Sequence, residues 1–167
     1  MEESIRGWFI GRVDDDWFEG PPSVEYDRDE ILVIGRIAEP SMGDDVSDDD
    51  KVAARLSRIE AFRKKTRRGR IEVARVAEAT FGRKVSWGVE CGDRTELFTT
   101  LAAPAMTRLR MPERRLLDTL VSAGVARSRS EALAWCVHQV GKHQSEWLGE
   151  LEDAIDKVDE VRRRGPD

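Results

Sequence analysis

In the run Met106–Met111, two arginines at alternate positions are flanked by Thr107, Leu109 and Met111, and Pro112 follows directly. Successive side chains of a β-strand point to opposite faces, so a strand here would have one basic face and one more apolar face. Pro112 suits the first turn of a helix and therefore ends the strand. The basic face would carry Met106, Arg108 and Arg110, and the opposite face Thr107, Leu109 and Met111.

Two short helices are predicted after this strand. The first runs from Pro112 to about Ala123, and Gly124 is its end signal. The second begins at Ser128, because Glu131 three residues later completes the spacing of a capping box. One strand and two short helices are too little to bury a core alone. The apolar stripes of the two helices are Leu116, Leu117, Leu120 and Val121, and Leu133, Cys136, Val137 and Val140.

This arrangement resembles the ribbon-helix-helix family of DNA-binding proteins, which contains the Arc and CopG-type repressors. The resemblance covers about a third of the chain, roughly Pro104–His143, and is most specific in residues 108–112 and 124–133. In that family two chains pair their strands into an antiparallel ribbon that lies in the DNA major groove. The resemblance therefore implies a homodimer that binds double-stranded DNA.

The same resemblance implies roles for seven residues. Those that would face base edges are Met106, Arg108 and Arg110. Those that would contact phosphates, at the N-terminus of the second helix, are Arg127, Ser128, Arg129 and Ser130. Backbone N–H groups and the helix dipole favour an anion there. Thr107 departs from the larger apolar residue usual at its position, so the first ribbon pair is expected to be looser. The alternative is an ordinary strand-helix-helix unit whose exposed arginines only meet solvent.

The net charge of −5 for the whole chain is unfavourable for DNA binding, but this charge is distributed unevenly along the chain. Residues 1–50 carry 4 basic and 16 acidic side chains, a net −12, whereas residues 51–104 carry 13 and 6, a net +7. Residues 105–143 carry 7 basic and 3 acidic side chains, a net +4. Because the local field at the docking face governs phosphate contact, the charge of the whole chain does not exclude DNA binding.

The first hundred residues predict an α+β module, residues 1–101, that precedes the ribbon-helix-helix unit. Its second and third strands read as a hairpin, and its last two flank the compact turn Gly92-Asp93. The third strand is nearly continuously apolar, which is typical of a central strand. The expected strands are Ile5–Val13, Val24–Tyr26, Ile31–Ile37, Val85–Cys91 and Thr95–Leu101.

A long helix is predicted between these strands, from about Asp49 to Phe81, with Ser47 as its N-cap and Gly82-Arg83-Lys84 as its end. Its middle, residues 63–70 (Arg-Lys-Lys-Thr-Arg-Arg-Gly-Arg), is the most basic segment of the protein. Such a run can contact a nucleic-acid backbone, because each neutralised phosphate releases counterions. We favour the alternative, a solvated helix face that balances the acidic first fifty residues.

The fold class that follows is α+β: N-terminal antiparallel strands with one long helix, then a ribbon-helix-helix unit at residues 104–143, then a C-terminal helix at residues 144–167. The last helix has a single apolar stripe on a charged background. This stripe either packs on the N-terminal module or forms a short coiled coil with a partner chain, and its spacing does not decide between them. The stripe consists of Trp147, Leu148, Leu151, Ile155, Val158 and Val161.

No residue pattern supports catalysis, a metal site or a cofactor. His138 and His143 are five residues apart, which is not the i, i+4 spacing of a helical zinc site. Cys91 and Cys136 lie in separate segments, and no glycine-rich phosphate loop occurs. The loop 39–50 holds five aspartates, but their spacing does not match a calcium loop. We expect no enzyme and no cofactor.

The expected function is a homodimeric transcriptional regulator, such as a repressor, that inserts a two-stranded ribbon into the major groove. One alternative is a protein interaction module that uses the ribbon-helix-helix only to dimerise and contacts a protein partner through its acidic N-terminal part. An antitoxin or partition protein is another. No apolar run approaches the ~20 residues of a membrane span, and the N-terminus lacks the profile of a signal peptide. We therefore expect a cytoplasmic protein without a membrane partner.

Overall fold

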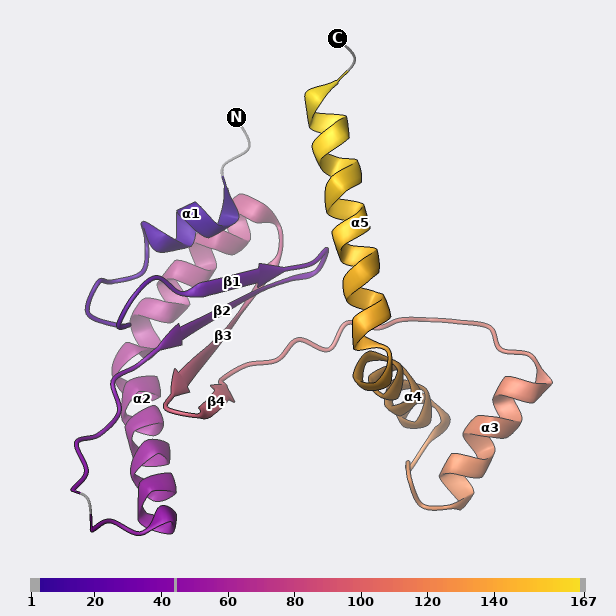
Figure 1. Cartoon of the computed structure of the whole chain (residues 1–167), viewed down its shortest axis with the longest axis horizontal. Coiled ribbons are helices and arrows are strands. Elements are labelled where there is room, and N and C mark those ends of the chain that lie inside the picture. The colour runs from indigo at the N-terminus through magenta and orange to yellow at the C-terminus, as the bar shows by residue number, and fades with distance from the viewer. Residues whose placement is uncertain (1–3, 44, 166–167) are drawn as a thin grey trace. The chain divides into compact units, whose positions relative to one another are not determined.

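The computed structural model describes residues 4–43 and 45–165, and the chain divides into two compact units, residues 1–104 and 105–167 (Figure 1). The fold is mixed α+β, as the sequence predicted. None of the described helices is both long enough and apolar enough to cross a bilayer. The N-terminal unit contains α1 (Ile5–Ile10), β1 (Ser23–Tyr26), β2 (Glu30–Arg36), α2 (Asp48–Phe81), β3 (Lys84–Cys91) and β4 (Arg94–Leu97).

The four strands form one sheet in the order β1-β2-β3-β4. The two predicted hairpins are confirmed, because β1 pairs antiparallel with β2 and β3 pairs antiparallel with β4. The sheet is mixed, however, and not antiparallel throughout. β2 and β3 run parallel, in register from Glu30 opposite Lys84 to Arg36 opposite Glu90. Helix α2 makes the crossover between them, which is the connection that parallel neighbours require.

The prediction of a strand over Ile5–Val13 is wrong, because the first part of this range forms helix α1. The Ser4 hydroxyl accepts a hydrogen bond from the N–H of Gly7 at 3.3 Å and caps the helix. Ile5, Trp8 and Phe9 have the i, i+3, i+4 spacing of one helix face, and both aromatic side chains are buried. The aromatic composition favours a strand, whereas the spacing of these residues fits a helix.

Helix α2 confirms the predicted long helix and its caps. Its N-cap Ser47 accepts a hydrogen bond from the N–H of Asp50, and it ends at Gly82, whose φ of 67° lies in the left-handed region. One face of α2 packs on the sheet and buries Ile59, Phe62 and Ala77. This face closes the main core of the unit, where aromatic rings from α1, α2, the sheet and the connecting loops meet edge to face and stacked.

The C-terminal unit contains α3 (Met111–Ser122), α4 (Arg129–His143) and α5 (Ser145–Arg164), close to the predicted helices. The predicted strand over Met106–Met111 is not formed in the single chain. Residues 99–110, all of which the structure describes, contain neither helix nor strand, and α3 already begins at Met111. A strand needs a neighbour with which to exchange backbone hydrogen bonds. Nothing in this unit supplies one to the segment within the described chain.

Replacing Gly35 by alanine tests the packing of the core. Gly35 is buried in β2, and a Cβ there would overlap the ring of Phe18. That ring stacks on Phe62, with 5.6 Å between ring centroids, so it has little room to move. We expect Gly35→Ala to lower the free energy of unfolding by about 1–3 kcal/mol in denaturant titrations.

The matched control is Gly20→Ala, because a Cβ at Gly20 meets nothing within 4 Å. This control should change the free energy of unfolding by less than about 0.5 kcal/mol. Equal effects of the two substitutions would contradict the close approach of β2 to Phe18.

Candidate nucleic-acid interface

In the segment before α3, residues 108–110 follow the predicted alternation between exposed and buried side chains. Leu109 is partly buried against the small core of α3 and α4, whereas Arg108 and Arg110 are exposed. Arg114 of α3 fixes this segment, since its Nη1 donates a hydrogen bond to the carbonyl of Leu109 at 2.8 Å. Met106 is fully exposed. In the described part of the chain, the guanidinium groups of Arg108 and Arg110 have no acidic partner and are free to contact an external ligand.

The N-terminus of α4 has the predicted cap. Ser128 Oγ accepts a hydrogen bond from the N–H of Glu131 at 3.2 Å, and the Glu131 carboxylate accepts one from the N–H of Arg127 at 2.8 Å. The backbone N–H groups of Arg129 and Ser130 have no acceptor among the described residues. Two unpaired N–H groups at the positive end of a helix can bind a phosphate oxygen.

The side chain of Arg129 is already engaged within the unit. Its Nε and Nη2 donate to the two carboxylate oxygens of Asp118 on α3, each at 2.7 Å. These hydrogen bonds hold the pKa of Asp118 below its ordinary value and raise that of Arg129. The pair therefore links α3 to α4. Sequence reasoning missed Asp118, because nothing local relates two residues on different helices.

The predicted site residues thus fall into two groups on different segments. Arg108 and Arg110 lie on the extended segment, and residues 127–130 lie at the start of α4. Arg127 and Ser130 are exposed, so their side chains remain available beside the two free N–H groups. The guanidinium of Arg129, bound to Asp118, is better placed to orient the helix end than to contact phosphate.

The C-terminal unit buries very little of its apolar surface in the single chain. Its buried residues are only Leu117, Ala126 and Ala132 among those described. Val137 was expected to face inward but is 65% exposed, and Leu116 is 56% exposed. Exposed apolar surface on this scale marks an interaction site. The other large apolar side chains left exposed on α3, α4 and α5 are Met111, Trp135, Val140, Trp147, Leu151, Ile155, Val158 and Val161.

The histidines and cysteines form no reactive cluster. His143 shares a hydrogen bond with Gln139 at 3.1 Å, and Cys91 is buried in the sheet, where burial raises its pKa. Among residues 4–43 and 45–165, no three histidine, cysteine or carboxylate side chains are close enough to hold a metal ion. Of the five aspartates expected in a loop at residues 39–50, three lie in the first turn of α2, and Asp44 lies outside the described residues.

Residues 3–97 match the domain family described as "Rv1265-like protein, N-terminal domain", which covers more than half of the chain. The chain belongs to this Rv1265-like family. Residues 110–162 match the family described as "Mb1296 C-terminal domain". Similar proteins include the uncharacterized protein Rv1265 of Mycobacterium tuberculosis strain H37Rv and the uncharacterized protein Mb1296 of Mycobacterium bovis. Each is 53% identical over 161 residues, which is 96% of this chain and 69% of the relative. No solved structure matches the chain.

These matches leave the ribbon-helix-helix resemblance as a prediction, since neither family description names it or any function. The two matched ranges lie on either side of residues 98–109. Met106 and Arg108 are therefore outside both ranges, and Arg110 is the first residue of the second.

The Asp118–Arg129 pair predicts a pH-dependent stability of the C-terminal unit. A carboxyl group whose pKa is lowered by folding stabilises the folded state above its unfolded pKa, and this contribution is lost as the pH falls through the folded pKa. Stability should therefore decline below about pH 4, near the ordinary pKa of aspartate. Asp118→Asn should lower the melting temperature at neutral pH and weaken this decline, as measured by circular dichroism.

The matched control is Asp153→Asn on α5, because no ion pair of Asp153 occurs within the described chain. Asp153→Asn should leave the pH dependence of the melting temperature close to that of the wild type. Identical pH profiles for Asp118→Asn and the wild type would show that the pair does not stabilise the unit.

Proposed function

We propose that this protein is a homodimeric DNA-binding transcriptional regulator whose C-terminal unit forms a ribbon-helix-helix with a second copy. Residues 106–110 of the two chains pair into an antiparallel ribbon that enters the major groove. The observation that carries this proposal is the segment itself: it is anchored through Leu109, it lacks a strand partner, and it leaves Arg108 and Arg110 exposed.

The exposed apolar surface of the C-terminal unit supports the dimer. The described part of this 63-residue unit has only three buried apolar side chains, a core too small to be stable alone. A second copy would cover the exposed residues of α3 and α4, such as Leu116 and Val137. It would also supply the missing neighbour for the segment before α3, so one association event would create both the core and the ribbon.

The chemistry of the exposed side chains supports contact with DNA. Arginine makes bidentate hydrogen bonds with O6 and N7 of guanine in the major groove, and a dimer presents Arg108 and Arg110 twice. Met106 would make apolar contact beside them. Phosphates would bind at the start of α4, through the N–H groups of Arg129 and Ser130 together with the side chains of Arg127, Ser128 and Ser130. A regulator of this kind acts in the cytoplasm.

Substitution of Arg108 tests base reading directly. DNA sites would first be recovered by genome-wide binding, and the affinity of the full chain for one such site and for unrelated DNA would then be compared. Arg108→Ala should weaken binding to the recovered site by about 1–3 kcal/mol and reduce the preference over unrelated DNA. Ser128→Ala should instead weaken binding to both DNAs alike, because a phosphate contact carries no sequence information.

Unchanged affinity and preference in Arg108→Ala would remove the base-reading role. A salt series separates the regulator from a module that only dimerises, since electrostatic DNA binding weakens steeply with added salt. Absence of DNA binding by the wild type even at low salt would favour the interaction module.

The dimer can be tested without DNA. Val137→Glu should convert the dimer to a monomer in sedimentation experiments, because it places a charge in a surface that a second copy would cover. Val137 is exposed in the single chain, so the substitution removes no packing contact within one chain. The control Asp156→Asn lies on the side of α5 opposite its apolar stripe and should remain dimeric. A monomeric wild-type protein would contradict the proposal.

A further inference from the structure

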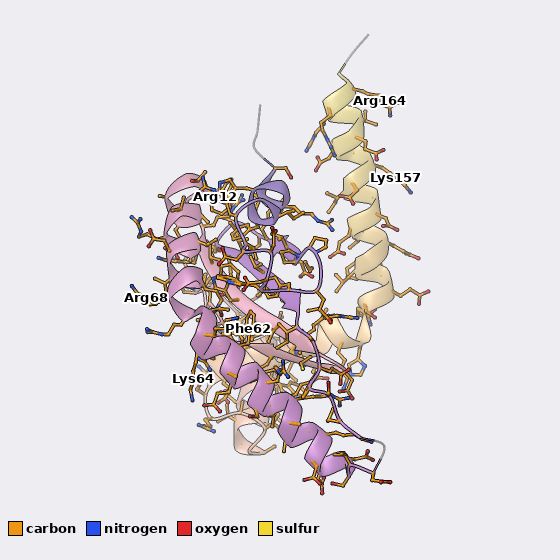
Figure 2. All side chains as sticks on the ribbon, turned by 90° about the vertical axis from the view of Figure 1, so that its left-hand side faces the viewer. Arg12, Phe62, Lys64, Arg68, Lys157 and Arg164 are labelled. Carbon is orange, nitrogen blue, oxygen red and sulfur yellow. The ribbon has the colours of Figure 1, made fainter. Side chains whose placement is uncertain are left out.

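The middle of α2 carries a concentrated positive charge on its outer side. Residues 63–70 contain six basic and no acidic side chains. Phe62 and Thr66 point into the unit and are buried, whereas Lys64, Arg67 and Arg68 are exposed. Figure 2 shows Lys64 and Arg68 projecting from α2 away from the rest of the unit. We call Lys64, Arg67 and Arg68 the cationic face.

Some cations of this unit are paired with acidic groups and others are not. Arg55 donates to Glu39 and to Asp93, each at 2.8 Å, and Lys84 lies 2.7 Å from Glu78. The cationic face contains both kinds. Lys64 has a partner in Glu60 at 2.7 Å, but Arg67 and Arg68 have no acidic partner in the part of the chain that the structure describes. Two exposed guanidinium groups are therefore free.

A buried arginine beside this face adds positive charge that no carboxylate neutralises. Arg70 is 7% exposed and donates hydrogen bonds only to neutral acceptors, Thr66 Oγ1 at 3.0 Å and the carbonyl of Arg63 at 2.9 Å. Its guanidinium lies 4.6 Å from the ring centroid of Phe98. Burial, followed by the charges of Arg63 and Arg67, lowers the pKa of Arg70. Arg67, Arg68 and Arg70 thus leave a local positive field that an external anion can neutralise.

We propose that the cationic face binds the sugar–phosphate backbone of double-stranded DNA, beside the site held by the C-terminal unit. This inference rests on the proposed function, because the C-terminal unit brings the duplex within reach. Residues 102–110 join the two units and span at most ~32 Å when fully extended. Tethering at that length gives the cationic face a high effective concentration of DNA.

The geometry of the helix suits a repeating polyanion. Lys64 and Arg68 are four residues apart, so they lie ~6 Å from each other along the helix axis on the same side. Each guanidinium can form two parallel hydrogen bonds to one phosphate. The contacts are to phosphates alone, so they add affinity without adding sequence preference.

The test compares the full-length wild type with the double variant Arg67→Gln/Arg68→Gln on random-sequence double-stranded DNA and on a recovered binding site. Loss of two phosphate contacts per chain, and so of four per dimer, should reduce the slope of log K against log salt by about 3.6 and weaken binding to both DNAs by the same factor. The preference for the recovered site should stay unchanged. The control Arg36→Gln, an exposed arginine paired with Glu90 on the sheet, should keep the wild-type slope.

The outcomes separate this inference from the proposed function. An unchanged salt slope in the double variant overturns the inference, whatever Arg108→Ala does. A reduced slope together with full sequence preference in Arg108→Ala supports the cationic face and overturns base reading by the ribbon. Binding of the wild type to anionic phospholipid vesicles but to neither DNA, lost in the double variant, would assign the face to a membrane surface and overturn the inference.

Discussion

The parallel pairing of β2 with β3 is the constraint on which the N-terminal unit depends. Parallel neighbours cannot be joined by a tight turn, so α2 must return along the sheet before β3 begins. Its inner side is then committed to the aromatic core through Ile59, Phe62 and Ala77. Once that side is fixed, the helical period dictates what faces outward. The position of the basic side chains is therefore a consequence of sheet topology.

The C-terminal unit, in contrast, has no comparable core. Its helices leave most of their large apolar side chains exposed, and the segment before them has no strand partner in the single chain. Inside the unit, order comes from local polar contacts: the cap at Ser128 and the bidentate pair between Asp118 and Arg129. These contacts fix the angle between α3 and α4 but bury little surface, so they cannot replace a core.

Features set by local signals could be predicted from the sequence. The two hairpins, the cap at Ser47 and the glycine at 82 all depend on residues close together in the chain. Features set by tertiary or intermolecular contacts could not. Helix α1 is only six residues long, so its aromatic composition favoured a strand more strongly than the spacing of its apolar residues favoured a helix. The partner of Arg129 is eleven residues away on another helix, and the strand expected over Met106–Met111 has no neighbour in the single chain.

The irregular segment 99–110 has a consequence for how the two units could cooperate. Thr99 and Leu101 are hydrogen-bonded to the N-terminal unit, so if residues 106–110 enter a ribbon, only residues 102–105 remain as a linker, and four residues reach at most ~14 Å. That distance corresponds to about four base pairs of duplex. Dimerisation would therefore shorten the linker to each N-terminal unit and limit that unit to the DNA that immediately flanks the ribbon. Folding of one segment would set the length of DNA that the whole protein occupies.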